Sequence, residues 1–226
     1  MVRPAPKSWG RKLGIGSDGR AYRGGMGTEY KPGSGGGFAY KFENNLSLYM
    51  QLANKEILDF IIKTNVFSIS LWAYTPTGAN TGRRGYLGCG VGANDYGFAL
   101  SELNLQGEKT RLTKQTPISP QAYSPDTRST TAIPEEAWSH IAVTVSDNEA
   151  KIYLNGVEVA SQAGPFRTAN TGLTSPLVIG KYTYNNGGNS TAAFAGWQDD
   201  IRVYNRTLSL EEVAYLGSAR GVQGKP

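Results

Sequence analysis

Cysteine and histidine are nearly absent from the sequence, which has one of each among 226 residues. The single cysteine, Cys89, cannot form a disulfide within the chain, so an internal disulfide framework is excluded. A chain of this length buries enough apolar surface to fold without disulfides or a structural metal. Cys89 lies among glycines, and the only histidine, His140, lies inside an apolar run. We therefore interpret Cys89 as a small buried residue and not as a nucleophile.

Long apolar runs are also missing. No stretch reaches the roughly eighteen apolar residues that a membrane-spanning helix needs. The first ten residues contain no apolar segment of the kind that marks a secretory signal peptide. We expect a soluble chain that is made in the cytoplasm and has no membrane partner.

The residue patterns of common catalytic sites are absent as well. The sequence has no Ser–His–Asp constellation, no cluster of metal ligands and no phosphate-binding loop. Glu135 and Glu136 are adjacent and would point to opposite faces of an extended segment, whereas a retaining glycosidase needs two carboxylates about 5 Å apart. Glu211 and Glu212 fall in the first turn of a predicted terminal helix, where they complement its dipole. We expect no enzymatic activity and no cofactor.

The net positive charge of the chain comes from its first 37 residues. The net charge is +5, and residues 1–37 hold seven basic against two acidic residues. From Phe38 onward the basic and acidic residues balance. The high isoelectric point therefore describes an attached segment and not a basic face of a folded domain.

Residues 1–37 are predicted to form an extended arm. They contain eleven glycines and few apolar residues, without helical or strand periodicity, so they cannot offset their chain entropy alone. Scattered aromatic residues suit a segment that becomes ordered on another surface, and a flexible tail is the open alternative. The residues expected to contact a partner are Arg3, Trp9, Arg11, Lys12, Arg20, Tyr22, Arg23 and Tyr30.

After the arm, the pattern is one of short strands separated by turns. Residues 67–74 place apolar side chains on both faces, with Trp72 and Tyr74 opposite the others, which is typical of a central strand. Residues 106–136 are polar and contain four prolines, so they form either an excursion or a pair of irregular strands. The other early strands are expected at 38–42, 46–52, 85–91 and 96–105.

Two segments are predicted to be helical, at 56–62 and 208–216. The second is the stronger, because Ser209 can cap a helix whose third residue is Glu212. The remaining elements are strands, which predicts an antiparallel all-β domain with one short terminal helix.

Residues 137–160 carry the clearest local signal. An Asn-Gly pair at Asn155–Gly156 lies between alternating runs, and a two-residue turn of this kind needs positive φ at both positions. This predicts a β-meander. Trp138 is interpreted as the anchor of the first strand, and His140 as a hydrogen-bonded residue in a strand and not as a metal ligand.

The same stretch resembles a known family. The segment W-S-H-I-A-V-T-V (138–145), followed by K-I-Y-L-N-G-V-E-V-A (151–160), is similar to the signature hairpin of the laminin-G-like / concanavalin A-like jelly-roll superfamily. F-S-I-S-L-W-A-Y (67–74), L-V-I-G (177–180) and the stretch F-A-G-W-Q-D-D-I-R-V-Y-N-R-T-L-S-L-E-E-V (194–213) match further elements in the expected order. The resemblance covers roughly residues 38–217 and leaves out the arm and the tail, 218–226.

The resemblance implies a two-sheet antiparallel jelly-roll sandwich. In this superfamily an acidic pair like Asp199–Asp200 often fixes local turns, and in some members it contributes to a structural calcium site. We keep Asp199 and Asp200 as candidate calcium ligands. The superfamily also includes endoglucanases with a Glu-x-Asp-x-x-Glu motif, which this sequence lacks, so the fold alone does not imply catalysis.

One functional hypothesis is recognition of a carbohydrate. Sugar sites combine aromatic platforms with amide or carboxylate groups on exposed loops. The candidate residues lie in the glycine-rich segment 181–190, and an ordinary turn-rich hairpin is the open alternative. They are Tyr182, Tyr184, Asn185, Asn186 and Asn189.

A second hypothesis uses the arm. A neutral jelly roll with a basic, aromatic-dotted extension suits a non-catalytic protein of a virion or similar particle surface, such as a capsid decoration or tail component. The closing G-S-A-R-G-V (217–222) is similar to tails of laminin-G-like domains in phage structural proteins. The expected partners are shell or tail proteins and surface glycans, with a second copy of the chain left open. Nucleic acid ranks last, because no dense basic run is present.

Overall fold

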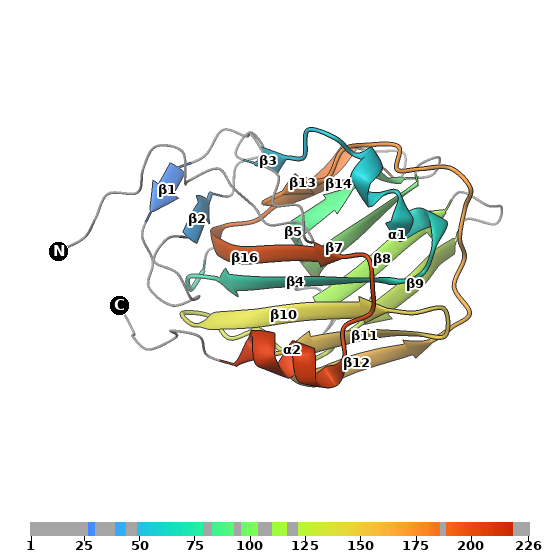
Figure 1. Ribbon diagram of the computed structural model, residues 1–226. Helices are drawn as coiled ribbons and strands as arrows, with labels where there is room; N and C mark the ends of the chain where they lie inside the picture. Colours follow the sequence, from blue (N-terminus) through green and yellow to red (C-terminus); the bar gives the residue numbers. More distant parts are fainter. Residues whose placement is uncertain are drawn as a thin grey trace.

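In a computed structural model the protein is a two-layer β-sandwich. The described residues are 27–29, 39–43, 49–78, 83–92, 96–103, 110–116, 122–185 and 189–218. Two large antiparallel sheets face each other, and Figure 1 shows the seven-stranded sheet in front of the six-stranded one. The predicted two-sheet antiparallel sandwich is confirmed.

The seven-stranded sheet contains β4 (Phe67–Tyr74), β10 (Trp138–Val145) and β16 (Gly196–Tyr204), which carry the candidate functional site described below. All its neighbouring pairs are antiparallel. In spatial order its strands are β1 (Gly27–Glu29), β2 (Ala39–Phe42), β16, β4, β10, β11 (Glu149–Leu154) and β12 (Val157–Ala163).

The six-stranded sheet forms the second layer and is also antiparallel throughout. Its last two strands lie within residues 106–136, so that polar, proline-containing stretch forms a pair of strands and not an excursion. The spatial order is β3 (Met50–Gln51), β13 (Val178–Ile179), β5 (Arg83–Cys89), β7 (Gly97–Leu103), β8 (Thr110–Thr116) and β9 (Ala122–Arg128).

A small third sheet and three helical segments complete the described elements. The small sheet pairs β15 (Asn189–Ala193) with β14 (Lys181–Asn185), and β14 with β6 (Val91–Gly92) in parallel. The helical segments are a 3-10 turn at Glu56–Leu58, α1 (Phe60–Lys63) and α2 (Leu210–Gly217). None of the helices in the described ranges is both long and apolar enough to cross a membrane.

The hydrophobic core lies between the two large sheets. It takes alternate side chains from long strands such as β4 and β10, as expected for strands with one face inward. Cys89 belongs to this core, which confirms its interpretation as a small buried residue. From β4, β10 and β16 the core takes Phe67, Ile69, Leu71, Ala73, Ile141, Val143, Val145, Ile201 and Val203.

The α2 helix covers part of the outer face of the seven-stranded sheet (Figure 1). Val213 packs with Leu208 against Ala142 of β10 and Tyr153 of β11. The predicted capping box is present, because the Ser209 side chain accepts from the Glu212 backbone N–H while the Glu212 carboxylate accepts from the Ser209 N–H. The helix therefore begins where the sequence predicts.

The hairpin at Asn155–Gly156 also follows its prediction. The two residues have φ values of 51° and 81°, as a primed turn requires. A side chain on Gly156 would come within 3.2 Å of the Ala214 Cα, so glycine also lets the hairpin approach α2. The Asn155 side-chain oxygen accepts a hydrogen bond from the His140 backbone N–H at 2.8 Å.

A short part of the predicted arm belongs to the sandwich. Residues 27–29 form β1, which pairs with β2 at the edge of the seven-stranded sheet. The eight arm residues expected to contact a partner lie outside the described residues. Along one side of the sandwich the Gln162 side chain of β12 accepts hydrogen bonds from Asp126 and Thr127 of β9, which ties the two sheet edges together.

A buried lysine links the six-stranded sheet to the end of α1 and to the loop that follows β12. Lys114 of β8 is 0% exposed, and its ammonium group donates to the Asn65 side chain and to the Arg167 carbonyl. Burial lowers the pKa of Lys114 to about 8, and the nearby charge of Asp147 opposes this effect only in part. The folded protein therefore releases the Lys114 proton at a lower pH than the unfolded chain does.

This linkage predicts how stability depends on alkaline pH. Between about pH 8 and the ordinary lysine pKa of 10.5, the unfolded chain binds the proton more tightly than the folded protein. The contribution of Lys114 to the free energy of unfolding should therefore rise with pH, by up to about 1.4 kcal/mol per unit. In urea unfolding at pH 8, 9 and 10, Lys114→Met should lose this rise, and Lys63→Met at an exposed position should keep it. Parallel curves for the wild type and Lys114→Met would contradict the linkage.

Candidate functional site

Aromatic side chains form a row across the outer face of the seven-stranded sheet. Tyr74 at the end of β4 is opposite Trp138 of β10 on one side and Trp197 of β16 on the other. The ring centroids of Tyr74 and Trp138 lie 5.8 Å apart, and those of Tyr74 and Trp197 lie 5.4 Å apart. Lys41 of β2 is opposite Trp197, with its ammonium 5.7 Å from the indole centroid. We call Trp138, Tyr74, Trp197 and Lys41 the aromatic row.

The sheet register explains why these side chains meet. Residues directly opposite each other in antiparallel strands project from the same face with Cβ atoms about 5 Å apart. Both tryptophans are half-buried, whereas Tyr74 is buried between them. Trp138 begins its strand as predicted, but its ring lies on the outer face and not in the core between the sheets.

Glu136 lies beside the row in a constrained conformation. Its φ is 55°, which is unusual for a residue other than glycine. Its carboxylate accepts a hydrogen bond from the Tyr74 hydroxyl at 2.5 Å and from the Thr77 backbone N–H at 2.7 Å. Burial, together with this carboxylate, raises the pKa of Tyr74 to about 12, so the phenol stays protonated and keeps donating.

Glu135 and Glu136 lie in a turn and not in an extended segment, and they contact different partners. The Glu135 carboxylate lies 3.3 Å from the guanidinium of Arg84, whose side chain is buried and also contacts Glu102 at 3.3 Å. The Tyr86 hydroxyl donates to Glu102 at 2.9 Å inside the sandwich. Glu135 thus supports a buried polar network, and Glu136 supports the outer aromatic row.

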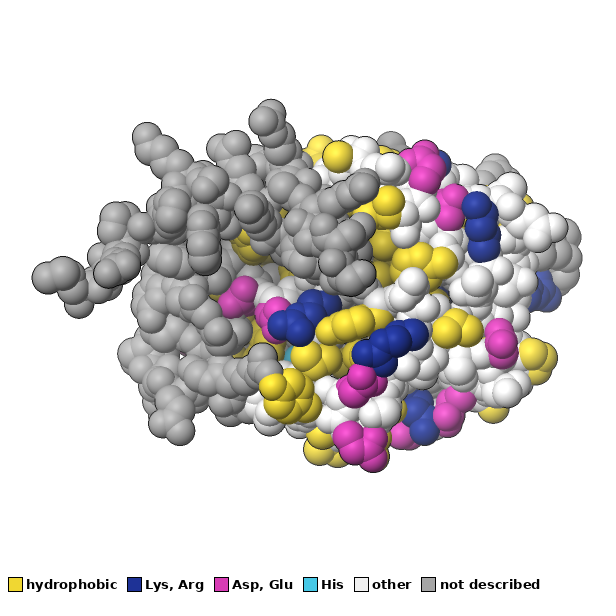
Figure 2. Space-filling model, viewed as in Figure 1, with side chains coloured by type: hydrophobic (Ala, Val, Ile, Leu, Met, Phe, Trp, Pro, Cys, Tyr) yellow, Lys and Arg dark blue, Asp and Glu magenta, His cyan; other side chains and the backbone are white. Residues whose placement is uncertain are grey.

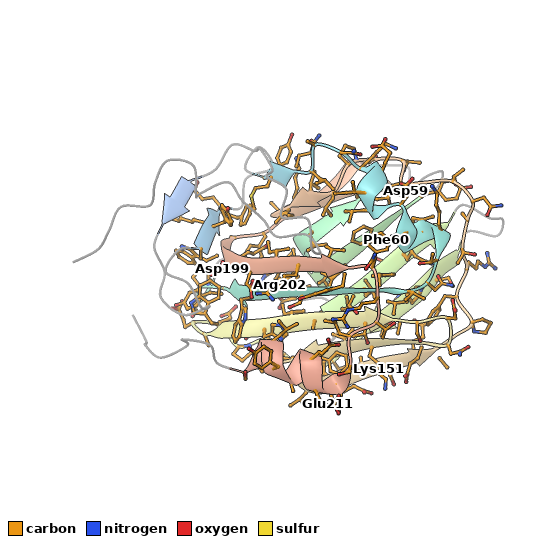
Figure 3. All side chains as sticks on the ribbon, viewed as in Figure 1. Asp59, Phe60, Lys151, Asp199, Arg202 and Glu211 are labelled. Carbon is orange, nitrogen blue, oxygen red and sulfur yellow. The ribbon has the colours of Figure 1, made fainter. Side chains whose placement is uncertain are left out.

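Asp199 and Asp200 lie at a β-bulge in β16, two and three residues after Trp197. The pairing of β16 with β4 shifts between Asp199 and Arg202, and Asp200 has a φ of 48°. The Asp199 carboxylate accepts from the Asp200 backbone N–H at 2.7 Å, which fits the predicted role in a local turn. Figure 3 labels Asp199 and Arg202 on the strand, and Figure 2 shows acidic and basic side chains gathered there beside apolar ones.

The geometry of this acidic pair favours an ion pair over a calcium site. Arg202 donates to Asp200 Oδ1 from both Nε and a terminal nitrogen, each at 2.7 Å. Calcium prefers six or more oxygen ligands. Within the described ranges no group of three or more His, Cys, Asp or Glu side chains could hold a metal ion. Calcium binding by Asp199 and Asp200 stays a prediction.

The predicted carbohydrate residues lie on another part of the molecule. Tyr182, Tyr184 and Asn185 are in β14, and Asn189 begins β15, so their backbone forms a hairpin. The side chains of these four residues, and all of Asn186, lie outside what the structure describes. That prediction stays open. Among the side chains that the structure describes, the aromatic row is the better candidate for a binding site.

The sequence predicts Trp138 as the anchor of its strand but does not predict the aromatic row. It also predicts that Tyr74 lies on the second face of its strand, which the structure confirms. The missing information was the register, because Tyr74, Trp138 and Trp197 come from three strands far apart in the chain. A signal was present in that Tyr74 ends β4, Trp138 begins β10 and Trp197 is the second residue of β16.

His140 lies on the same face, next to the row. Its ring is 5.4 Å from that of Trp72, and Nε2 lies 2.8 Å from the Ser70 hydroxyl. Nδ1 is buried and has no hydrogen-bond partner within the described part of the chain, so His140 is only half satisfied. A side chain on Gly217 would come within 3.0 Å of Nδ1, which shows how closely the end of α2 covers the ring. Burial, with a smaller effect from Arg202, lowers the pKa of His140 to about 4.

The family comparison covers most of the sandwich. The sequence model of the concanavalin A-like lectin/glucanases superfamily matches residues 44–214. No curated protein matches the sequence.

Solved structures share the fold. Domain 4 of AbnA, a GH43 extracellular arabinanase from Geobacillus stearothermophilus in complex with arabinotriose, is 24% identical with a TM-score of 0.61, covering 92% of this chain and 87% of that one. The CBM40 of the Ruminococcus gnavus IT-sialidase, bound to α2,3-sialyllactose, is 17% identical with a TM-score of 0.59, covering 79% and 96%. A SAP-like pentraxin from Limulus polyphemus is 15% identical with a TM-score of 0.56, covering 82% and 83%.

The buried histidine predicts a loss of stability in mild acid. His140 is the only histidine, and below its ordinary pKa of 6.5 the unfolded chain binds a proton that the folded protein excludes. The free energy of unfolding should therefore fall as the pH falls from about 6.5 toward 4. Urea unfolding at pH 7, 6, 5.5 and 5 should show this slope in the wild type, and His140→Gln should flatten it above pH 5. Equal slopes in both proteins would contradict the assignment.

Proposed function

The chain belongs to the concanavalin A-like lectin/glucanases superfamily, and we propose that it is a non-catalytic carbohydrate-binding module that binds its ligand on the aromatic row. The observation that carries this proposal is the arrangement of two half-buried tryptophans about a buried tyrosine, with fixed charged groups beside them. Binding sites of this kind combine aromatic walls with a few placed polar groups.

The chemistry of the row suits a sugar. An indole ring packs against the apolar C–H face of a sugar, and the ring hydroxyls then need polar partners at the side. Glu136 lies two residues before Trp138, and Asp199 lies two residues after Trp197 on the same face. The Glu136 carboxylate is already oriented by Tyr74 and Thr77, so little ordering is needed when a ligand binds.

Two of the similar structures support the ligand class, because their descriptions name bound arabinotriose and α2,3-sialyllactose. A purely binding role is supported by the carboxylates. Glu135 pairs with Arg84, Glu136 with Tyr74, and Asp200 with Arg202. Each of these carboxylates is engaged by a different partner, whereas glycosidases place two across one bond.

Replacing the tryptophans tests the site. Trp138→Ala and Trp197→Ala should each weaken binding to a recognised polysaccharide about tenfold, which corresponds to about 1.4 kcal/mol for one lost ring contact. Affinity electrophoresis in gels containing single polysaccharides, followed by calorimetric titration, measures the change. Tyr215→Ala on α2 is the matched control, because Tyr215 is an exposed aromatic residue that is not a member of the row. If both tryptophan variants bind like the wild type, the ligand lies elsewhere, with the β14–β15 hairpin as the next candidate.

Attachment to a virion or other particle surface stays a second proposal. The basic side chains that would bind the particle lie outside the described residues. Because β1 is part of the sheet, removal of 1–37 would also remove an edge strand. We therefore compare the full chain with variants that begin at residue 27 and at residue 38. Pull-down from the native source should recover a shell or tail protein with the full chain alone. Equal recovery by all three would contradict attachment through the arm.

A further inference from the structure

The two tryptophans of the aromatic row are separate platforms. They are carried by β10 and β16, and β4 lies between these strands. Strands in a sheet are about 4.8 Å apart, so the two backbones are about 10 Å apart. A six-membered sugar ring, built from single bonds of about 1.5 Å, is only about 3 Å across. One sugar therefore cannot lie on both indoles.

The ring between the tryptophans acts as a spacer. Tyr74 is 3% exposed, so it offers little surface to a ligand, but its ring touches both neighbours and holds them apart. Its hydroxyl is fixed on Glu136. The spacing of the two platforms is thus set by the sheet and by a buried, hydrogen-bonded side chain, and not by flexible loops.

Each platform has its own polar neighbour. Glu136 lies two residues before Trp138 in the sequence, while Lys41 and Asp199 lie beside Trp197. A ligand that spans the row therefore meets the Lys41 ammonium at one end and passes the carboxylates of Glu136 and Asp199, which lie beside the rings. This order suits two or more sugar rings in sequence, each with an apolar face down and hydroxyls at its side.

The described strands do not close the row at either end. Pairing of β11 with β10 starts at Ile141 opposite Leu154, beyond Trp138, so no residue of β11 stands opposite that tryptophan. At the other end the residue opposite Lys41 is Gly27 of β1, which has no side chain. Within the described strands, a chain that enters over one tryptophan can continue past the other.

From this geometry we infer that the ligand is an internal segment of a linear polysaccharide that lies across the strands, with one sugar on each tryptophan. The inference rests on the proposed function and adds the length and direction of the ligand. A site for terminal sugars would instead be closed at one end and would hold a single ring.

Chain length is the first measurement. The full-length protein is titrated by calorimetry with arabinan, xylan, mannan and glucan, and with the one- to six-sugar fragments of each. For every backbone that binds, we expect affinity to rise at least tenfold from one sugar to three or four and then level off. A monosaccharide that binds as tightly as its hexasaccharide overturns the inference and leaves the proposed function standing. Absence of binding to the whole panel overturns both.

Stoichiometry and variants sharpen the test. Many protein molecules should bind one long polymer chain, because internal segments recur along it, whereas recognition of chain ends gives one or two molecules per chain. Trp138→Ala should level off at a shorter oligosaccharide and lose roughly five- to tenfold in affinity for the hexasaccharide. Its affinity for the monosaccharide should change little. Tyr215→Ala should follow the wild-type curve, and an equal loss by Trp138→Ala at every length would overturn the two-platform arrangement.

Discussion

Strand β4 is buried at each of its eight positions, and this double burial organises the rest of the molecule. Its inner side chains belong to the core between the sheets, and its outer side chains need cover of their own. A strand in the middle of a sheet has its backbone paired on both sides, so only its two faces remain to be satisfied. The cover on the outer face is therefore a structural requirement, and the candidate site lies on that face.

Two kinds of cover divide the outer face. At the start of β4 the chain that leads into α2 crosses it, where the Ser68 hydroxyl bonds the Arg206 carbonyl and accepts from the Leu208 N–H. At the end of β4 the cover is aromatic, with Trp138 and Trp197 on either side of Tyr74. His140 lies between these parts, with its ring against Trp72 and the end of α2 over it. The packed helix and the aromatic row are thus neighbouring parts of one surface.

Much of the fold could be predicted from the sequence because its signals are local. The Asn155–Gly156 turn, the capping box at Ser209 and the alternation in 67–74 each involve a few consecutive residues and a known backbone requirement. The aromatic row could not be predicted in this way. It depends on which residues of three distant strands stand opposite each other, and one-residue slips would place the same side chains on opposite faces. The conformation of Glu136 is likewise imposed by contacts with Tyr74 and Thr77.

The bulge in β16 shows how closely the site and the core are coupled. In a regular strand, side chains alternate, so Trp197 and Asp199 on the outer face would be followed outward by Ile201. The extra residue at Asp200 changes the phase, and Ile201 becomes buried in the core while Arg202 stands opposite Ser70. Aspartate tolerates the left-handed conformation that the bulge requires, and Arg202 holds its carboxylate in place. One strand can therefore present Trp197 and Asp199 to a ligand and still contribute Ile201 and Val203 to the core. Removal of the bulge would force a choice between the two.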